Sequence, residues 1–239
     1  MTLTLIQLYP RDMNLYGDWG NTLTLKKRLE WRGYTVTVID HNPGDATDFS
    51  RGDIFIGGGG QDAGQTIIQD DLIAHADQLA RLVTDGAPML LICGMYQLFG
   101  RRFVTSDGTV ITGAGILPIE TRAGRERLIG NITLDSDQFG QIVGYENHSG
   151  QTFLDQGAQA FGRVSRGAGN NTTDEHEGVR YHNVIATYLH GPLLPRNPQI
   201  ADFLIQAALA RRGIQQPLST LAIDQVAAAA HDTAANRPR

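Results

Sequence analysis

The first hundred residues alternate between short apolar strands and amphipathic helices, and this alternation restricts the fold more than any other feature of the chain. Leucines and isoleucines at helical spacing predict one helix from Asn21 to Gly33 and a second over residues 67–83. Strands that alternate with helices form a largely parallel sheet with helices on its faces, so we predict a three-layer, flavodoxin-like α/β fold with a mostly parallel central sheet. The strand-like runs are Thr2–Tyr9, Thr35–Ile39, Asp53–Ile56 and Pro88–Ile92.

After Gly100 the pattern becomes shorter and more β-like, with Gly, Asn and Asp turns between the runs. A last amphipathic helix is expected over Pro198–Arg212. No repeat or linker divides the chain, so we predict one domain over residues 1–212 and a tail over 213–239 that forms a loose helix or a docking segment. The strands expected in this half are Ile116–Ile119, Ile129–Leu134, Gln141–Tyr145 and Val184–Tyr188.

Composition excludes several classes of function. The net charge of −5 and the scattered Lys and Arg residues give nucleic-acid binding no support. We expect neither a secretory signal nor a membrane span, because the chain has no charged-then-apolar leader and no apolar run near about 18 residues. The single cysteine, Cys93, can form no internal disulfide or multi-cysteine zinc site, and we expect a reducing, cytoplasmic location.

Cys93 is the first candidate for chemistry, because it directly follows a predicted strand. Gly94 and a predicted helix over Met95–Phe99 come next. A strand–turn–helix exposes a side chain at the tip of a bend, where the following amides stabilise an oxyanion and the helix N-terminus favours a thiolate. The alternative is a buried structural cysteine that behaves as a small apolar residue.

His190 is the matching candidate for a general base. It follows an apolar strand and precedes Gly191 and Pro192, so it is expected to project from a sheet edge. A cysteine nucleophile needs an imidazole that takes its proton and later protonates the departing ammonia. His148 is the second candidate, but its turn setting indicates a structural or rim role.

The four glycines Gly57–Gly60 follow another predicted strand. They lack the Gly-x-Gly-x-x-Gly and Lys-Ser/Thr patterns of nucleotide-binding loops, so nucleotide binding is weakly supported. The glycines are equally suited to aim a backbone amide at a developing oxyanion. The simplest interpretation is a tight turn that tolerates a positive φ.

Five short segments together resemble the cobyric-acid-synthase-like class I glutamine amidotransferases, and among them the glutaminase subunits of lipid II isoglutaminyl synthases. The resemblance covers about residues 3–212 and implies the class I glutamine amidotransferase fold. The segments are Tyr16-Gly-Asp-Trp-Gly-Asn21, Gly57-Gly-Gly-Gly-Gln-Asp62, Cys93-Gly-Met-Tyr-Gln97, Gly144-Tyr-Glu-Asn-His148 and Thr187-Tyr-Leu-His-Gly-Pro192.

The resemblance implies a role for each matching residue. Arg127 would hold the α-carboxylate of glutamine through its guanidinium, although its own sequence context indicates only a solvated turn. Gln97 would contact the substrate. The remaining implied roles are nucleophile for Cys93, general base for His190, and oxyanion-hole amides for Gly58, Gly59 and Gly94.

Three positions depart from the pattern of many class I amidotransferases. Leu91 and Met95 replace glycines that flank the nucleophile, and Pro192 stands where a glutamate follows the histidine. The chain therefore shows a Cys–His dyad without an evident acid. We hypothesise that a partner subunit supplies the missing carboxylate.

The resemblance further implies a reaction and a partner. The chain would hydrolyse L-glutamine and pass ammonia to a Mur-ligase-like, ATP-dependent partner, MurT, in a heterodimer. That partner would amidate the D-glutamate of the lipid II stem peptide to D-isoglutamine. ATP and Mg would bind the partner, and this subunit would need no metal or cofactor. The alternatives are an amidotransferase for another acceptor such as a corrinoid, a non-catalytic binding scaffold, and, with less support, a cysteine peptidase.

Overall fold

The central element of the fold is a six-stranded sheet in the computed structural model, which describes residues 1–238. All neighbouring strands in it pair in parallel except β11 with β12, which confirms the predicted mostly parallel sheet. From one edge to the other its strands are β11 (Val179–Tyr181), β12 (Val184–Thr187), β4 (Met89–Ile92), β3 (Ile54–Gly57), β1 (Thr2–Leu8) and β2 (Thr35–His41).

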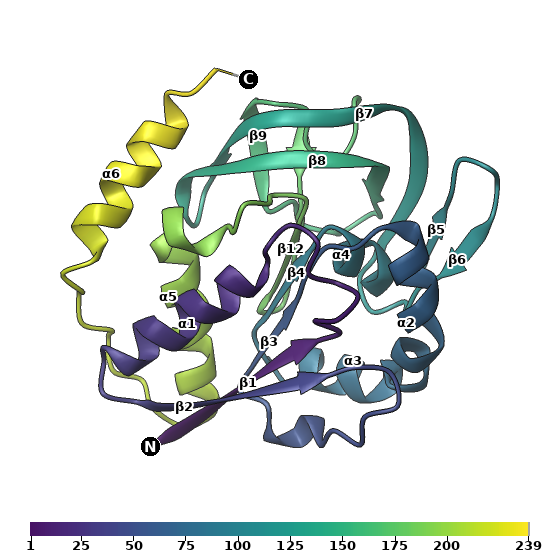
Figure 1. The fold of residues 1–239 in the computed structure, drawn as a ribbon. Helices are drawn as coiled ribbons and strands as arrows, with labels where there is room; N and C mark the ends of the chain where they lie inside the picture. Colours follow the sequence, from purple (N-terminus) through teal and green to yellow (C-terminus); the bar gives the residue numbers. More distant parts are fainter. Residues whose placement is uncertain (239) are drawn as a thin grey trace.

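Helices cover both faces of this sheet (Figure 1). The chain moves from β1 to β2 in one direction and from β3 to β4 in the other. Right-handed crossovers therefore place α1 (Trp19–Glu30) on one face and α2 (Asp62–Ala74) with α3 (Ala76–Thr84) on the opposite face. The helix α5 (Pro198–Arg211) packs beside α1 and confirms the helix predicted over 198–212. The short helices are α4 (Gly94–Phe99), η1 (Phe49–Arg51) and η2 (Leu194–Arg196).

The single helix predicted over residues 67–83 is wrong, because the chain forms α2 and α3 with a break at His75. The His75 ring packs edge-on against His41 and Phe49, with ring centres 5.3 and 5.0 Å away. These partners lie far away in sequence, so the apolar periodicity of the helix contains no sign of the break.

A second six-stranded sheet, which the sequence did not predict as a separate unit, contains most of residues 102–177. Its centre is the long antiparallel hairpin of β7 and β8 (Figure 1). The strand predicted at Ile116–Ile119 begins only at Ile119, since the Ile116 and Leu117 amides donate to the Phe99 carbonyl and Pro118 has no N–H. The strands are β5 (Arg102–Val104), β6 (Val110–Thr112), β7 (Ile119–Ser136), β8 (Gly140–Leu154), β9 (Gly162–Arg166) and β10 (His176–Glu177).

The two sheets meet where β12 ends. The His190 amide donates to the Tyr145 carbonyl of β8 at 2.8 Å, and these residues form an isolated antiparallel bridge. This contact brings the β7–β8 hairpin over the carboxyl edge of the central sheet. Ligands of parallel α/β sheets bind at that edge.

The chain beyond Gly213 contains helix α6 (Asp224–Ala235), which lies outside α1 and α5 and runs towards the second sheet (Figure 1). Asp224 bonds Arg28 at 2.7 Å, and the His231 ring bonds the Arg196 carbonyl at 2.8 Å. The division between residues 212 and 213 stays a prediction. Among residues 1–238, no helix combines the length and the apolar character that crossing a membrane requires.

Candidate active site

Cys93 occupies a strained bend between β4 and α4. Its φ of 51° and ψ of −102° are rare for a residue with a side chain. The bend is fixed on both sides, because the Cys93 amide donates to Thr187 of β12 at 2.9 Å and the Cys93 carbonyl accepts from Gln97 at 3.0 Å. Strain that the surrounding structure maintains in this way is typical of functional residues.

His190 lies close to Cys93 because their strands are neighbours. Thr187 at the end of β12 pairs with Ile92 at the end of β4, so both side chains leave the same edge of the sheet. Gly59 lies against both of them. A Cβ on Gly59 would meet the His190 Cε1 at 3.0 Å and the Cys93 Cβ at 3.2 Å, so this position has little room for a side chain.

Burial keeps both candidate catalytic groups neutral in the free chain. Burial, reinforced by the nearby Asp18 carboxylate, raises the pKa of Cys93 to about 12. Burial, reinforced by His148 and Arg127, lowers the pKa of His190 to about 3. Neither nitrogen of the buried His190 ring has a hydrogen-bond partner within residues 1–238. A neutral imidazole and a neutral thiol are the starting state from which general-base catalysis begins.

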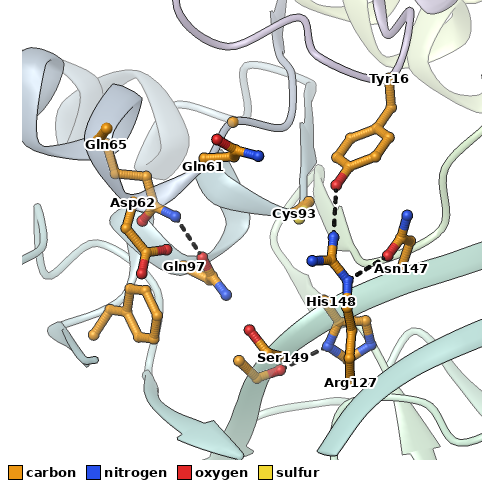
Figure 2. A pocket seen from close by; sticks show the side chains of 14 residues that line it. Tyr16, Gln61, Asp62, Gln65, Cys93, Gln97, Arg127, Asn147, His148 and Ser149 are labelled. Atoms are coloured by element: carbon orange, nitrogen blue, oxygen red, sulfur yellow. Dashed lines mark hydrogen bonds between the residues drawn. The ribbon is translucent and has the colours of Figure 1, made fainter. Parts of the chain in front are cut away.

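A pocket of about 340 Å³ opens in front of Cys93. Among the described residues its lining includes Cys93 and His148 but not His190. The Tyr16 ring packs against the His190 ring, with centres 4.2 Å apart. Figure 2 shows Tyr16, Arg127 and Asn147 on one side of the pocket, Asp62, Gln65 and Gln97 on the other, and Cys93 between the two groups.

Arg127 of β7 points into this pocket and is held there by two residues (Figure 2). Its Nε donates to the Asn147 Oδ1 at 2.7 Å, and its Nη2 donates to the Tyr16 hydroxyl at 3.1 Å. Within residues 1–238 these are the hydrogen bonds of the guanidinium, so Nη1 stays available to a carboxylate. The structure thus places Arg127 in the pocket that Cys93 also lines, although its contact with a substrate stays a prediction.

Gln97 of α4 lines the pocket, and each end of its amide has one hydrogen-bond partner. Its Oε1 accepts from Gln65 at 2.8 Å, and its Nε2 donates to the Tyr188 hydroxyl at 3.1 Å. The substrate contact expected of Gln97 stays a prediction. The contacts that are present link α4 to α2 and to the end of β12.

His148 of β8 is buried at the pocket rim. Its ring stacks on Tyr188 with centres 3.6 Å apart and planes 2° from parallel, and its Nδ1 bonds the Gly150 carbonyl at 2.6 Å. Burial lowers the pKa of His148 to about 4. These contacts are those of a structural side chain that also borders the pocket.

The glycine loop adopts an orientation that sequence reasoning did not foresee. The Gly59 amide donates to the buried Asp18 carboxylate at 2.7 Å, and the Gly58 carbonyl accepts a long bond from the Met95 amide at 3.4 Å. The oxyanion-hole role expected of Gly58, Gly59 and Gly94 therefore stays a prediction. Asp18 was missed as a contact of this loop; the signal was its place in the segment 16–21, to which the family resemblance attached no role.

Comparison with known proteins identifies the class of the chain. Residues 4–198 match the CobB/CobQ-like glutamine amidotransferase domain, so the chain belongs to this family of glutamine amidotransferases. Two solved glutamine amidotransferases, one of them from Thermotoga maritima, share the fold with a TM-score of 0.55 at 16% and 13% identity. They cover 87% and 97% of this chain, and the matches span 99% and 93% of their own chains.

Within the family the chain is similar to a particular subunit, which confirms the resemblance drawn from the motifs. It is 42% identical to the lipid II isoglutaminyl synthase (glutamine-hydrolyzing) subunit GatD of Staphylococcus aureus, over 89% of this chain and 86% of that protein. The GatD subunit of Streptococcus pneumoniae is 39% identical over 88% and 82%. The cobyric acid synthase of Moorella thermoacetica is 31% identical over 57% of this chain but only 29% of its own length.

Proposed function

We propose that this chain hydrolyses L-glutamine with Cys93 as nucleophile and His190 as general base, and supplies the ammonia to a partner subunit. The observation that carries this proposal is the strained Cys93 bend with the His190 ring across Gly59 from it. A strained nucleophile, a buried imidazole and a facing pocket are the parts that acyl transfer requires.

The reaction begins with a proton transfer from the Cys93 thiol to His190 as the sulfur attacks the side-chain amide carbon of glutamine. The amide oxygen becomes an oxyanion near the N-terminus of α4. His190 then gives its proton to the amide nitrogen, and the C–N bond breaks to release ammonia. A water molecule, deprotonated by His190, hydrolyses the glutamyl thioester to glutamate and restores the thiol.

Arg127 is proposed to bind the α-carboxylate of the substrate through its available Nη1. Tyr16 and Asn147 hold the guanidinium on one side of the pocket. A fixed cation in the same pocket as the nucleophile selects a substrate with a carboxylate at one end and an amide at the other.

The acceptor is proposed from the relatives. Two proteins named as GatD subunits of lipid II isoglutaminyl synthase align with more than four fifths of their length. We infer that this chain forms a heterodimer with a Mur-ligase-like subunit, MurT, that binds ATP and Mg and amidates the D-glutamate of lipid II. This chain would then need no cofactor of its own. A corrinoid acceptor is less well supported, since the alignment covers under a third of a cobyric acid synthase.

His190 also motivates the hypothesis of a shared active site. Its two ring nitrogens have no partner within residues 1–238, so no carboxylate of the described chain orients the imidazole. A carboxylate from the partner would fix the tautomer and speed the reaction. The hypothesis fails if the isolated chain turns over glutamine as fast as the complex.

The test measures ammonia release from glutamine by the purified chain, alone and with a MurT-type partner. Cys93→Ser is expected to abolish release in both cases, and Arg127→Lys to raise KM far more than it lowers kcat. Glutamine should protect Cys93 from thiol labelling in the unmodified chain. Full activity in Cys93→Ser, or no turnover under any condition, would refute the proposal and leave the binding scaffold as the better interpretation.

A further inference from the structure

Asp18 is a buried carboxylate that the proposed reaction does not use. It is 2% exposed and lies in the turn between β1 and α1. Its Oδ2 accepts from the Gly59 amide at 2.7 Å, and its buried Oδ1 has no hydrogen-bond partner within residues 1–238. Burying a carboxylate with one oxygen unsatisfied is costly, and burial accordingly raises the pKa of Asp18 to about 6. A group that is costly to bury and adjacent to the nucleophile calls for a functional explanation.

The bond to Asp18 determines how the Gly58–Gly59 peptide faces the nucleophile. The peptide is trans, so an amide that points at Asp18 sends the Gly58 carbonyl in the opposite direction. That carbonyl accepts from the Met95 amide at 3.4 Å, at the N-terminus of the helix that follows Cys93. A carbonyl oxygen at this place opposes a developing negative charge, whereas an N–H in the same place would stabilise it.

The surrounding contacts hold the loop in this state. The Leu15 amide donates to the Gly59 carbonyl at 3.0 Å, so the same turn that carries Asp18 also grips the next peptide. Gly58 and Gly59 have no side chains, and glycine is the residue whose φ and ψ change most freely. The peptide is therefore able to turn once its amide is released.

We propose that Asp18 is a positioning residue that holds the Gly58–Gly59 peptide with its carbonyl towards α4 and so keeps the free chain slow. When the hydrogen bond from Gly59 to Asp18 is lost, the peptide turns and the Gly59 amide donates to the oxyanion formed on Cys93. This inference rests on the proposed role of Cys93. It assigns Asp18 no contact with the substrate.

The test compares two substitutions in the full chain. Asp18→Ala removes the acceptor of the Gly59 amide, whereas Asp18→Asn removes the charge but keeps a carbonyl oxygen in its place. Loss of one oxyanion donor costs about 100-fold to 1,000-fold in kcat in other enzymes, so we expect Asp18→Ala to raise kcat for glutamine at least about tenfold. Asp18→Asn should raise it less, with KM nearly unchanged in both. Alkylation of Cys93 by iodoacetamide forms no oxyanion and serves as the control. Both substitutions remove the negative charge of Asp18 near the thiol, so the alkylation rate should rise by the same factor in the two variants.

The outcomes separate this inference from others. An unchanged or lower kcat in Asp18→Ala with a near-normal Tm overturns the inference. It is also overturned if kcat rises in both variants only by the factor by which the alkylation rate rises. If Asp18→Ala does not fold, an Asp18→Asn kcat at or below that of the unmodified chain overturns it. Adding Cys93→Ser to Asp18→Ala must abolish turnover; if turnover survives, the failure is that of the proposed nucleophile.

Discussion

Replacing Gln97 with methionine tests whether this side chain is structural or contacts the substrate. The substitution keeps the length and approximate shape of the side chain but removes both polar ends. It would leave the buried Gln65 Nε2 without its acceptor and would remove one of the two hydrogen bonds of the Tyr188 hydroxyl, which keeps its bond to Thr152 at 2.6 Å.

The expected magnitude follows from these two losses. A buried polar group that loses its partner costs about 1–3 kcal/mol. Two such losses sum to about 2–6 kcal/mol, and because Tyr188 keeps one bond, the loss for Gln97→Met is expected in the lower part of this range, about 2–4 kcal/mol. The free energy of unfolding is measured by urea denaturation followed by circular dichroism. Gln61→Met is the matched control, because Gln61 lines the same pocket but is exposed, and a change within about 0.5 kcal/mol is expected there.

Kinetics on the same variants complete the test. If the structural argument holds, Gln97→Met loses stability while KM for glutamine changes by only a few-fold. A loss of stability below about 1 kcal/mol together with a rise of KM above about tenfold would refute the reasoning, because loss of the bonds to Gln65 and Tyr188 predicts the opposite pattern. Such a result would instead support the substrate contact that the family resemblance implies.

Two further predictions concern pH. In the free chain the alkylation rate of Cys93 should rise steadily with pH from 6 to 10, because burial raises the thiol pKa to about 12; a plateau near pH 7 would show an ion pair with His190 instead. Burial also raises the pKa of Glu177 to about 8, so the folded chain retains a proton that the unfolded chain releases near about pH 4.5. The contribution of Glu177 to the free energy of unfolding should therefore be highest below about pH 4.5 and fall as the pH rises to about 8. Denaturation measured over this pH range should show a weaker pH dependence of the unfolding free energy in Glu177→Gln. An unchanged pH dependence in that variant would contradict the raised pKa.

The part of the fold that sequence predicted well depends on local patterns. Apolar runs of strand length, helical spacing and glycine stops each lie within a few consecutive residues, so β1 to β4 were recognisable without knowledge of their neighbours. The same holds for the Cys93 bend, because a strand, a glycine and a short helix follow one another directly. His190 was recognisable for the same reason.

The missed features depend on partners that are remote in sequence. The break at His75 follows from rings on β2 and η1, and the second sheet follows from pairing between segments whose individual patterns only indicated short strands. The bond between Asp18 and Gly59 joins residues 41 positions apart. The Asp18 side of that bond does not differ in composition from an ordinary turn, so only the family resemblance drew attention to that segment.

The proposed nucleophile and the residue proposed to bind the substrate lie on or directly after strands of different sheets, and this has a mechanical consequence. Cys93 directly follows β4 of the central sheet and Arg127 lies on β7 of the hairpin, while the backbone bond from His190 to Tyr145 joins the two sheets next to the imidazole. The distance between the Cys93 sulfur and the Arg127 guanidinium therefore depends on how the two sheets are placed relative to each other. A misplacement of about 1 Å can cost about 100-fold in rate. Substitutions or binding events far out on the hairpin would therefore alter the rate if they change the distance between the Cys93 sulfur and the Arg127 guanidinium. Distance from the pocket along the chain is thus a poor guide to which positions tune the enzyme.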